Sequence, residues 1–426
     1  MFKRGRRQSF FSVVIASYNS AAWIKHTIRS VLEQTYRNFE VIVVGDGCTD
    51  GTEELLKTKF GKRIRWKNLQ SNSGSQSAPN NEGVRVARGS HIAYLGHDDI
   101  WSPHHLELLD GVVREQDPDF AVSGAVYHGP PGSMFYQIAG IFDDPDMVRR
   151  EFFPPSSFAH KRELTERIGG WRDPNELRAP PDCEFLLRAA DHACRFVSTK
   201  TISVHKFAAG HRYLSYRFPR GDEQKQLLQR LQASDGDATV LTEIIADLVN
   251  GASAPAVKQM DFDQFPPGDL YRGNRHNKGL DHSALLAIEK REVLTIESLP
   301  TALDWHELAQ HPVHGPFRWS GPNPNPRHFL SIRTTGPVQL RIYVIAFAAE
   351  DLAHSLRIDI DDREADFVCE RSSDGTYIFS GQFSTAVNDG LALRFRMPRS
   401  VPIATEFGTR RAGLALSRVE IMPGRD

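Results

Sequence analysis

The first hundred residues alternate between short apolar runs and stretches with helical periodicity. The apolar runs are "FFSVVIA", "FEVIVV" and "HIAYLG", and "AAWIKHTIRSVLEQT" places apolar side chains at helical spacing between the first two. Such alternation is typical of parallel strands joined by crossover helices, because a parallel strand is buried on both faces. We therefore expect an α/β sheet here, with a further strand at "IRWKNL" and a second helix in "DGCTDGTEELLKTKF".

Polar side chains stand where these predicted strands end. Asn19 follows the first strand, Asp46 follows the second, and Asp98 comes shortly after the strand "HIAYLG". Ligands of open α/β sheets bind beyond the carboxyl ends of the strands. Asp46 is suited to accept a hydrogen bond from a nucleobase N–H, although Asp-Gly is also an ordinary turn sequence.

The pattern changes along the chain, which at 426 residues is long enough for two or three domains. Residues 8–215 are predicted to be one α/β domain, and residues 216–314 a polar, helix-forming linker with "TVLTEIIADLV" as its best amphipathic piece. Residues 315–426 contain short alternating runs separated by Gly, Pro, Asn and Asp, such as "VQLRIYVIAF" and "YIFSGQF". Those runs predict an all-β sandwich.

Composition excludes some partners. The formal net charge is -1, with 52 Lys and Arg against 53 Asp and Glu, so no global field attracts nucleic acid. The four cysteines lack metal-ligand spacing, which favours reduced thiols in a cytoplasm. The basic N-terminus before "SFFSVVIAS" imitates a signal peptide, but the short apolar run favours a buried strand.

The stretch "YLGHDDIW" carries adjacent carboxylates at Asp98 and Asp99. Magnesium and manganese prefer hard oxygen ligands and often take one or two from the protein, with the rest from water and phosphate. We expect Asp98 to be a metal ligand and Asp99 to be more structural, for example as a helix cap. His97, His104 and His105 are weaker candidates, because a histidine beside a loop is usually only solvated.

A third cluster lies in "GGWRDPNELRAPPDCEFLLRAA". Asp182 stands at the start of a predicted helix, where the helix dipole favours an anion. It is interpreted as a general base or, alternatively, as a helix cap, with Glu184 as the reserve candidate for the base. Further on, "SVHKFAAGHRYLSYR" carries His205, Lys206, His211 and Arg212, any of which could face a diphosphate or a metal.

Taken in order, these motifs resemble glycosyltransferase family 2, whose members have the GT-A fold, a Rossmann-like α/β domain. The resemblance covers residues 10 to 215 and implies sugar transfer from a nucleoside diphosphate donor to a hydroxyl acceptor with inversion. In that scheme Asp182 is the catalytic base, Asp46 faces the base of the nucleotide, and Asp98 with His205 holds a divalent cation, Mn or Mg. The implied nucleotide-sugar site contains Ala16, Ser17, Tyr18, Asn19, Asp46, Asn81, His97, Asp98 and Asp99.

The chain departs from the family pattern at three places. Glycine replaces an aspartate at Gly45 and at Gly96, and Pro181 stands where the family has a glutamate. The retained acids favour an active enzyme with an altered metal requirement. The alternative is a catalytically silent nucleotide- or glycan-binding protein on the same fold. A nucleotidyltransferase lacks support, because no Gly-rich Arg and Lys signature follows the first strand.

The C-terminal runs, ending in "RRAGLALSRVEI", resemble the β-sandwich appended to some bacterial surface-polysaccharide and lipopolysaccharide glycosyltransferases. The two resemblances together imply a cytoplasmic enzyme at the inner face of the cell membrane, peripherally associated with it. A UDP sugar is the favoured donor, and a glycan or lipid-linked molecule is the expected acceptor.

Overall fold

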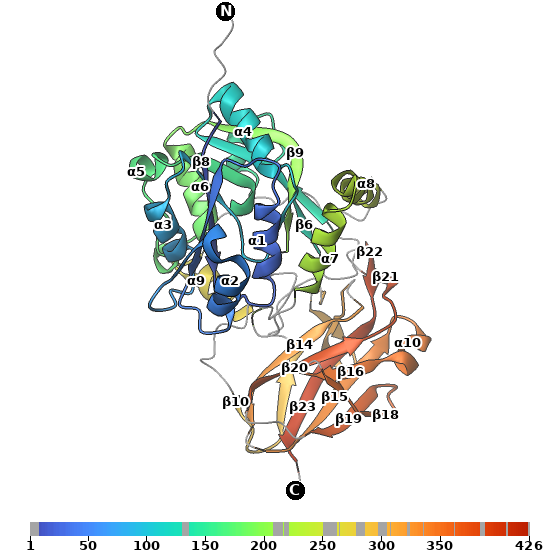
Figure 1. Cartoon of the computed structure of the whole chain (residues 1–426). Coiled ribbons are helices and arrows are strands. Elements are labelled where there is room, and N and C mark those ends of the chain that lie inside the picture. The colour runs from blue at the N-terminus through green and yellow to red at the C-terminus, as the bar shows by residue number, and fades with distance from the viewer. Residues whose placement is uncertain are drawn as a thin grey trace, which may run out of the picture. The chain divides into compact units, whose positions relative to one another are not determined.

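A computed structural model describes residues 8–129, 136–207, 216, 221–249, 262–263, 265–277, 286–296, 305–306, 308–321, 324–334, 336–361, 363–383, 388–405 and 408–424. The chain divides into two compact units (Figure 1). Unit 1 comprises residues 1–129 and 134–280, and unit 2 comprises residues 130–133 and 281–426.

Unit 1 is built around one mixed sheet with the strand order β3-β2-β1-β4-β8-β6-β9-β5, and β7 pairs with β6. Strands β1, β2, β3 and β4 run parallel, whereas β8 is antiparallel to both β4 and β6. The strands are β1 (Phe11–Ser17), β2 (Phe39–Gly45), β3 (Arg65–Asn68), β4 (His91–Tyr94), β5 (Ile100–Trp101), β6 (Phe120–His128), β7 (Tyr136–Ala139), β8 (Phe158–Lys161) and β9 (Phe196–Lys206).

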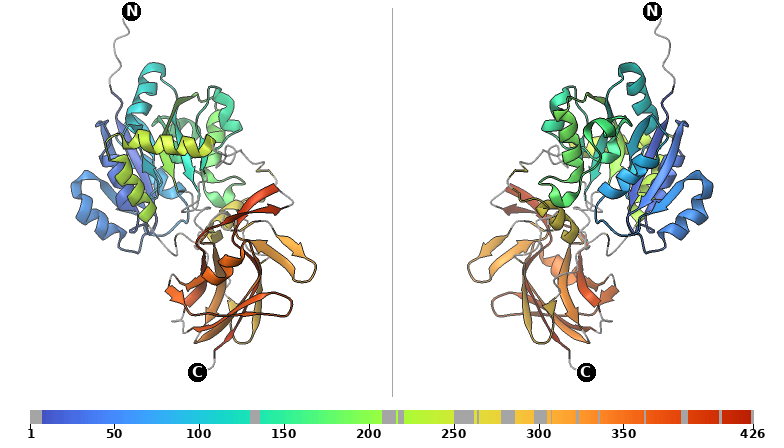
Figure 2. Two further views of the ribbon diagram at one scale, coloured as in Figure 1. Left: turned by 90° about the vertical axis from the view of Figure 1, so that its right-hand side faces the viewer. Right: turned by 90° about the vertical axis from the view of Figure 1, so that its left-hand side faces the viewer.

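Helices flank this sheet on both sides (Figure 2). Helix α1 shows why: Ile24, Ile28 and Val31 lie on one face and are completely buried, so the helix must cover the sheet. The helices of unit 1 are α1 (Ile24–Leu32), α2 (Thr52–Phe60), α3 (Ser77–Val86), α4 (His105–Gln116), α5 (Leu164–Ile168), α6 (Pro181–Asp191), α7 (Asp222–Leu231), α8 (Gly236–Val249) and α9 (Asp269–Asn277).

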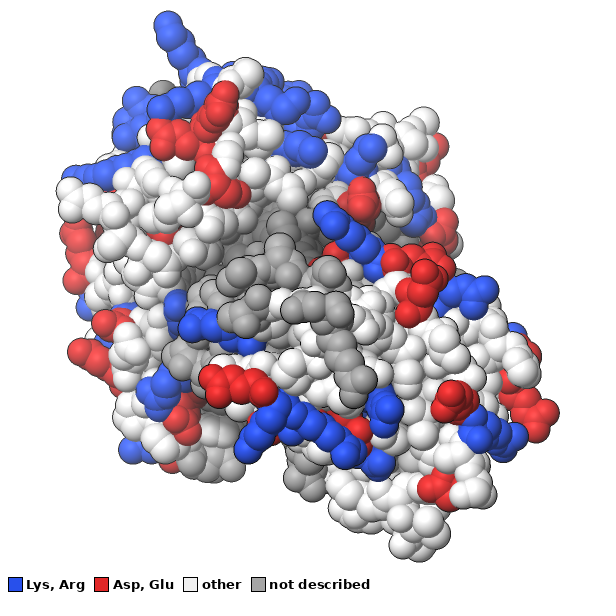
Figure 3. Space-filling view, turned by 90° about the horizontal axis from the view of Figure 1, so that it is seen from below, with Lys and Arg blue, Asp and Glu red and all other residues white. Residues whose placement is uncertain are grey.

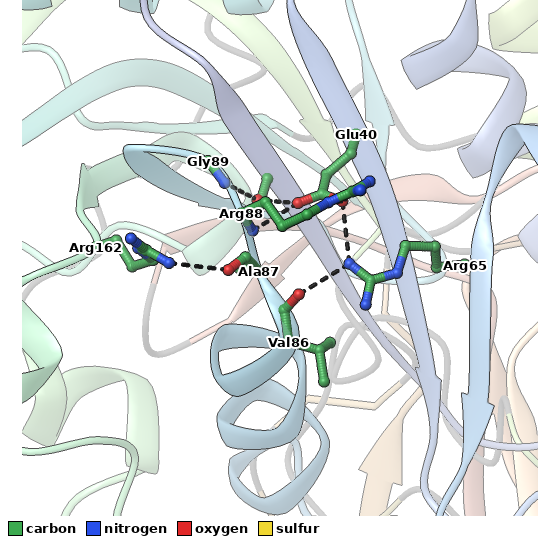
Figure 4. A network of polar contacts seen from close by, with 8 residues as sticks. Glu40, Arg65, Val86, Ala87, Arg88, Gly89 and Arg162 are labelled. Carbon is green, nitrogen blue, oxygen red and sulfur yellow. Dashed lines mark hydrogen bonds and ion pairs between the residues drawn. The ribbon is translucent and has the colours of Figure 1, made fainter.

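The amino-terminal ends of the first strands are tied together by Glu40 of β2 (Figure 4). Its carboxylate accepts hydrogen bonds from the guanidinium groups of Arg65 at 3.1 Å and Arg88 at 2.9 Å, and from Ser12 Oγ at 2.8 Å. Burial would raise the pKa of Glu40, but the hydrogen bonds from Ser12 and Arg88 outweigh it and lower the pKa. The candidate site lies at the other, carboxyl-terminal ends of these strands.

Unit 2 is a β-sandwich, as predicted. One sheet has the order β10-β14-β20-β16-β17, a second has the order β12-β13-β23-β15-β19-β18 with β11 on β23, and β21 pairs with β22 in a third. Leu340, Leu393 and Leu416, from the first two sheets, belong to one buried core. The elements are β10 (Leu286–Ala287), β11 (Glu292–Thr295), β12 (Ala309–His311), β13 (Gly315–Trp319), β14 (Arg327–Thr334), β15 (Val338–Phe347), α10 (Glu350–Ser355), β16 (Arg357–Ile360), β17 (Arg363–Ala365), β18 (Val368–Arg371), β19 (Tyr377–Phe383), β20 (Asn388–Arg396), β21 (Val401–Thr405), β22 (Gly408–Ala412) and β23 (Leu414–Pro423).

The stretch 216–314, expected to be a linker, contributes to both units. Helices α7 and α8 place Leu227, Leu231 and Ile244 in a core that also contains Ile100 and Val126 of the main sheet. Strands β10, β11 and β12 belong to unit 2. The apolar faces of α7 and α8 explain why these helices pack on the α/β domain. None of the described helices combines the length and apolar character needed to cross a bilayer.

Candidate active site

A cavity of about 320 Å³ opens in unit 1 at the carboxyl ends of β1, β2 and β4. The register pairs Ser17 with Gly45 at the ends of β1 and β2, so the residues that follow both strands meet there. Seven of the predicted site residues line this cavity, namely Ala16, Ser17, Tyr18, Asp46, His97, Asp98 and Asp182.

Asp46 anchors the loop that forms one wall. Its Oδ1 accepts hydrogen bonds from the backbone N–H of Ser73 at 2.9 Å and from Ser73 Oγ at 2.8 Å, and its Oδ2 accepts one from Gly74 N–H at 2.9 Å. Each carboxylate oxygen can accept about two hydrogen bonds. One acceptor position on Oδ2 therefore remains for a ligand. Gly47 has a φ of +66°, and a side chain there would collide with the backbone of Asn72, so this turn requires glycine.

Two tyrosines from distant parts of the chain border the cavity, and the sequence motifs gave no signal for either. Tyr271 of α9 lines it and donates a hydrogen bond from its hydroxyl to Ser73 O at 3.0 Å. Tyr216 lines it as well, and its hydroxyl lies 2.9 Å from His97 Nε2. His97 is thus held at the rim by Tyr216, and its ring also lies 5.8 Å from that of Trp23.

The two adjacent aspartates differ in environment. Asp98 is partly exposed and lines the cavity, whereas Asp99 is completely buried and does not. The Asp99 carboxylate accepts hydrogen bonds from Ser156 Oγ at 2.5 Å, Phe207 N–H at 3.0 Å and Lys206 Nζ at 3.1 Å. Asp99 therefore fastens β9 and the Ser156 loop to the end of β4.

Neighbouring side chains fill the space beside Gly45 and Gly96, the two glycines that stand where the family pattern has an aspartate. A Cβ at Gly96 would lie 2.7 Å from Asp99 Oδ2, and one at Gly45 would lie 2.4 Å from Asn68 Oδ1. Real Cβ atoms essentially never approach other atoms so closely. In each place the space where a first aspartate would begin is occupied by another group of this protein.

Asp182 lies near the start of α6 and faces the cavity beside Pro180 and Pro181. The proline at the first helical position suits a helix start, because its missing N–H would have no helical partner there. Pro180 is the N-cap, so Asp182 does not serve as the cap residue. The reserve candidate Glu184 does not line the cavity and instead pairs with Arg188 at 2.7 Å and with Arg172 at 3.1 Å.

Four predicted site residues do not line the cavity. Asn19 Oδ1 accepts a hydrogen bond from Thr49 N–H at 2.9 Å and so holds the loop after β2. Asn81 exchanges two hydrogen bonds of 2.8 Å with the backbone of Trp171. Asp99 is buried behind the cavity wall, as described above. His205 is the fourth predicted site residue that does not line the cavity. Asn19, Asn81 and Asp99 thus support the walls of the cavity.

His205 was expected to hold a metal together with Asp98, but the structure does not bring the two side chains together in the cavity. His205 is completely buried, and its Nδ1 lies 3.0 Å from His128 Nε2. Successive side chains of a strand point to opposite faces, and on β9 it is Lys206 that reaches the cavity. Burial also lowers the pKa of His205 to about 3.

The other histidine candidates lie elsewhere. His105 is buried against Trp101, and His104 pairs with Glu107 at the surface. His211 and Arg212 fall outside the described residues. Within the described part of the chain, no group of three or more His, Cys, Asp or Glu side chains is arranged to hold a metal ion. Asp98 can still supply one hard oxygen, which suffices for magnesium when water and phosphate complete its shell.

Lys206 is the only lysine or arginine among the described residues that line the cavity. Burial alone would lower the pKa of Lys206, but the carboxylates of Asp99 and Asp98 raise it above its ordinary value. The side chain therefore carries a positive charge at neutral pH. On the face shown in Figure 3, Lys and Arg are interspersed with Asp and Glu, and neither sign forms one continuous patch.

The amino-terminal part of this chain is similar to known glycosyltransferases. GlyG, a glycosyltransferase of Streptococcus pneumoniae, is 31% identical over 131 residues, which are 30% of this chain and 44% of GlyG. TuaG of Bacillus subtilis, a candidate glycosyltransferase of teichuronic acid biosynthesis, is 36% identical over 115 residues, which are 26% of this chain and 45% of TuaG. The chain thus spans less than half the length of either relative.

Among solved structures, S. aureus TarS 1-349 in complex with UDP-GlcNAc aligns with a TM-score of 0.39 and 22% identity, over 47% of this chain and 58% of TarS. The family model described as Glycosyl transferase family 2 matches residues 12–168, which include β2, β4, the two aspartates after β4, and all of β1 except its first residue. Residues 12–168 of this chain are therefore similar to a glycosyl transferase family 2 domain.

Proposed function

We propose that this protein is an inverting glycosyltransferase that moves a sugar from a nucleoside diphosphate donor to a hydroxyl acceptor. The observation that carries the proposal is the convergence of Asp46, Asp98 and Asp182, from three different parts of the chain, on one cavity. The family 2 domain supports the reaction class, and the similarity to TuaG supports a role in bacterial cell-surface polysaccharide or lipopolysaccharide synthesis. We place the reaction in the cytoplasm, at the inner face of the membrane, with a glycan or lipid-linked acceptor.

The donor nucleotide is assigned to the end of the cavity formed by Tyr18 and Asp46. Asp46 keeps one acceptor position for a base N–H, since Ser73 and Gly74 occupy the others. Ala16 and Ser17 form the floor where β1 ends. A UDP sugar remains the favoured donor, and the ring N–H of uracil suits such an acceptor.

Asp182 is assigned as the general base. Its carboxylate takes the proton from the acceptor hydroxyl while the hydroxyl oxygen attacks the anomeric carbon. The bond from that carbon to the diphosphate oxygen breaks in the same step, and its electron pair leaves with the diphosphate. One displacement inverts the anomeric centre, so no second carboxylate is required as a nucleophile.

Asp98 would hold a divalent cation, Mn or Mg, which when bound would supply positive charge at the diphosphate. Of the two ligands expected from the sequence, Asp98 is the one that lines the cavity. Asp99, Asn19 and Asn81 are proposed to position the walls, because each is bonded to the backbone of a neighbouring loop.

Release of nucleoside diphosphate tests the proposal. Purified protein is incubated with UDP, GDP and dTDP sugars and Mn or Mg, and the freed diphosphate is measured. We expect release with at least one donor. Asp182→Asn should abolish the release while leaving nucleotide binding intact, and Asp191→Asn, the same change at the far end of α6, should leave both unchanged.

The outcomes separate the alternatives. Loss of release in Glu184→Gln but not in Asp182→Asn would move the general base to Glu184. Nucleotide binding without release from any donor would favour the catalytically silent binding protein. At Gly45 and Gly96, the two glycines that motivate that alternative, Asn68 and Asp99 fill the space beside the backbone.

A further inference from the structure

The cavity in which the donor is proposed to bind has an imbalance of charge. Asp46, Asp98 and Asp182 all line it, whereas Lys206 is the only lysine or arginine among the described lining residues. A nucleoside diphosphate brings further negative charge to the same place. Its binding therefore requires a cation near the phosphates, and the chain itself offers one at Lys206.

Strand pairing fixes the position of Lys206. It is the last residue of β9, and its neighbour His205 pairs with Ile100 at the start of β5. The short turn of Asp98 and Asp99 immediately precedes β5, so Lys206 is carried to the side of these two aspartates. The pairing of β9 with β5 therefore sets the position of Lys206 beside Asp98 and Asp99.

The ammonium group is also held in place. Its Nζ lies 3.1 Å from Asp99 Oδ2, and that carboxylate is completely buried and fixed by Ser156 and Phe207. The Lys206 side chain keeps 22% of its surface exposed and lines the cavity. An ammonium has three N–H donors, so the contact with Asp99 leaves donors for a ligand.

We propose that Lys206 binds the diphosphate of the donor directly, beside Asp98, and neutralises charge on that group as it leaves. This inference rests on the proposed function. The ammonium forms charge-assisted hydrogen bonds with phosphate oxygens, and these bonds strengthen when the electron pair of the broken sugar bond moves onto the diphosphate. Lys206 thereby supplies, from the chain itself, part of the positive charge otherwise assigned to a divalent cation.

The test must separate phosphate binding from folding. Lys206→Met alone would leave the buried Asp99 carboxylate without its cation, which is strongly destabilising. We therefore compare Asp99→Asn with Asp99→Asn/Lys206→Met, so that no buried carboxylate is unpaired in either variant. Lys161→Met is the matched control, because Lys161 pairs with Asp117 at 3.2 Å and keeps 23% of its side chain exposed, but does not line the cavity.

Calorimetry in EDTA, which removes divalent cations, measures the affinity for UDP and for uridine. If UDP does not bind, the same comparison is made with GDP and guanosine, or with dTDP and thymidine. Adding Lys206→Met to Asp99→Asn should weaken UDP binding roughly 10- to 100-fold and leave uridine binding unchanged. Lys206→Arg should retain UDP binding, and Lys161→Met should change neither affinity.

Each other outcome is decisive. Equal UDP affinity in Asp99→Asn and the double variant overturns the inference about Lys206 and leaves the proposed function intact. An equal loss for UDP and uridine means that the substitution distorts the cavity, and it overturns the inference as well. If the unaltered protein binds none of the three diphosphates, the proposed function fails and this inference fails with it.

Discussion

Replacing Gly96 by alanine should destabilise unit 1, because the space beside Gly96 belongs to Asp99. The new Cβ would lie 2.7 Å from Asp99 Oδ2 and 3.2 Å from Asp98 Oδ1. Asp99 cannot move aside cheaply, since Ser156, Lys206 and Phe207 all donate to its carboxylate. Overpacking of a tight site of this kind costs about 1–3 kcal/mol.

A second glycine provides the opposite case. A Cβ at Gly111, inside α4, would meet no atom within 4 Å. Alanine is favoured over glycine within a helix by roughly 0.5–1 kcal/mol, so Gly111→Ala should stabilise the protein. The same substitution is thus expected to have opposite signs at the two positions, and the difference in free energy of unfolding should be roughly 1.5–4 kcal/mol.

Urea unfolding followed by tryptophan fluorescence measures both effects. Trp23, Trp66, Trp101 and Trp171 report on unit 1. A loss of about 2 kcal/mol should lower the urea midpoint by on the order of 0.5 M or more. A Gly96→Ala variant that is as stable as the unaltered protein would refute the reasoning, because Asp99 would then be free to yield its space.

Three further predictions follow from the same structure. Asp98→Asn should weaken the dependence of donor turnover on Mn or Mg, whereas the affinity for uridine should stay the same; a metal titration with unaltered half-saturation contradicts the role of Asp98. Asn81→Ala removes two hydrogen bonds to the backbone of Trp171 and should lower the free energy of unfolding, measured with urea, by about 1–3 kcal/mol. A change below about 0.5 kcal/mol would count against the supporting role of Asn81. Burial lowers the pKa of His105 from 6.5 to about 3, so between these pH values the unfolded chain binds a proton there that the folded chain does not. The contribution of His105 to stability is therefore complete above about pH 6.5 and is lost as the pH falls towards 3, and His105→Gln should reduce the loss of stability between pH 7 and pH 5 by about 2 kcal/mol. The same slope of stability against pH in both proteins would contradict this prediction.

The α/β core and most strands of the sandwich were predictable because their sequence patterns are local. "FEVIVV" forms β2 and "VQLRIYVIAF" forms β15 over its full length, since apolar periodicity and flanking turn residues decide both elements. The positions of Asp46 and Asp98 also followed from local information, because parallel strands bring their carboxyl ends together. The sequence accordingly predicted a site at this edge of the sheet.

What could not be predicted depends on which way a side chain points and on contacts between distant segments. His205 and Lys206 are adjacent, and a shift of one residue in the strand exchanges the one that faces the cavity. Tyr271 reaches the Ser73 loop from about two hundred residues away, and nothing in the intervening sequence records that contact. The sequence also does not reveal that the buried carboxylate of Asp99 fills the space beside Gly96.

A crystal structure with UDP bound would show whether this cavity is the donor site. We expect the uracil N–H to lie within hydrogen-bond distance of Asp46 and the diphosphate to contact Lys206 beside Asp98. The Asp182 carboxylate should stay clear of the nucleotide and face the space left for sugar and acceptor. A nucleotide bound outside the cavity, or with its phosphates remote from both Asp98 and Lys206, would contradict the assignment of this cavity as the donor site.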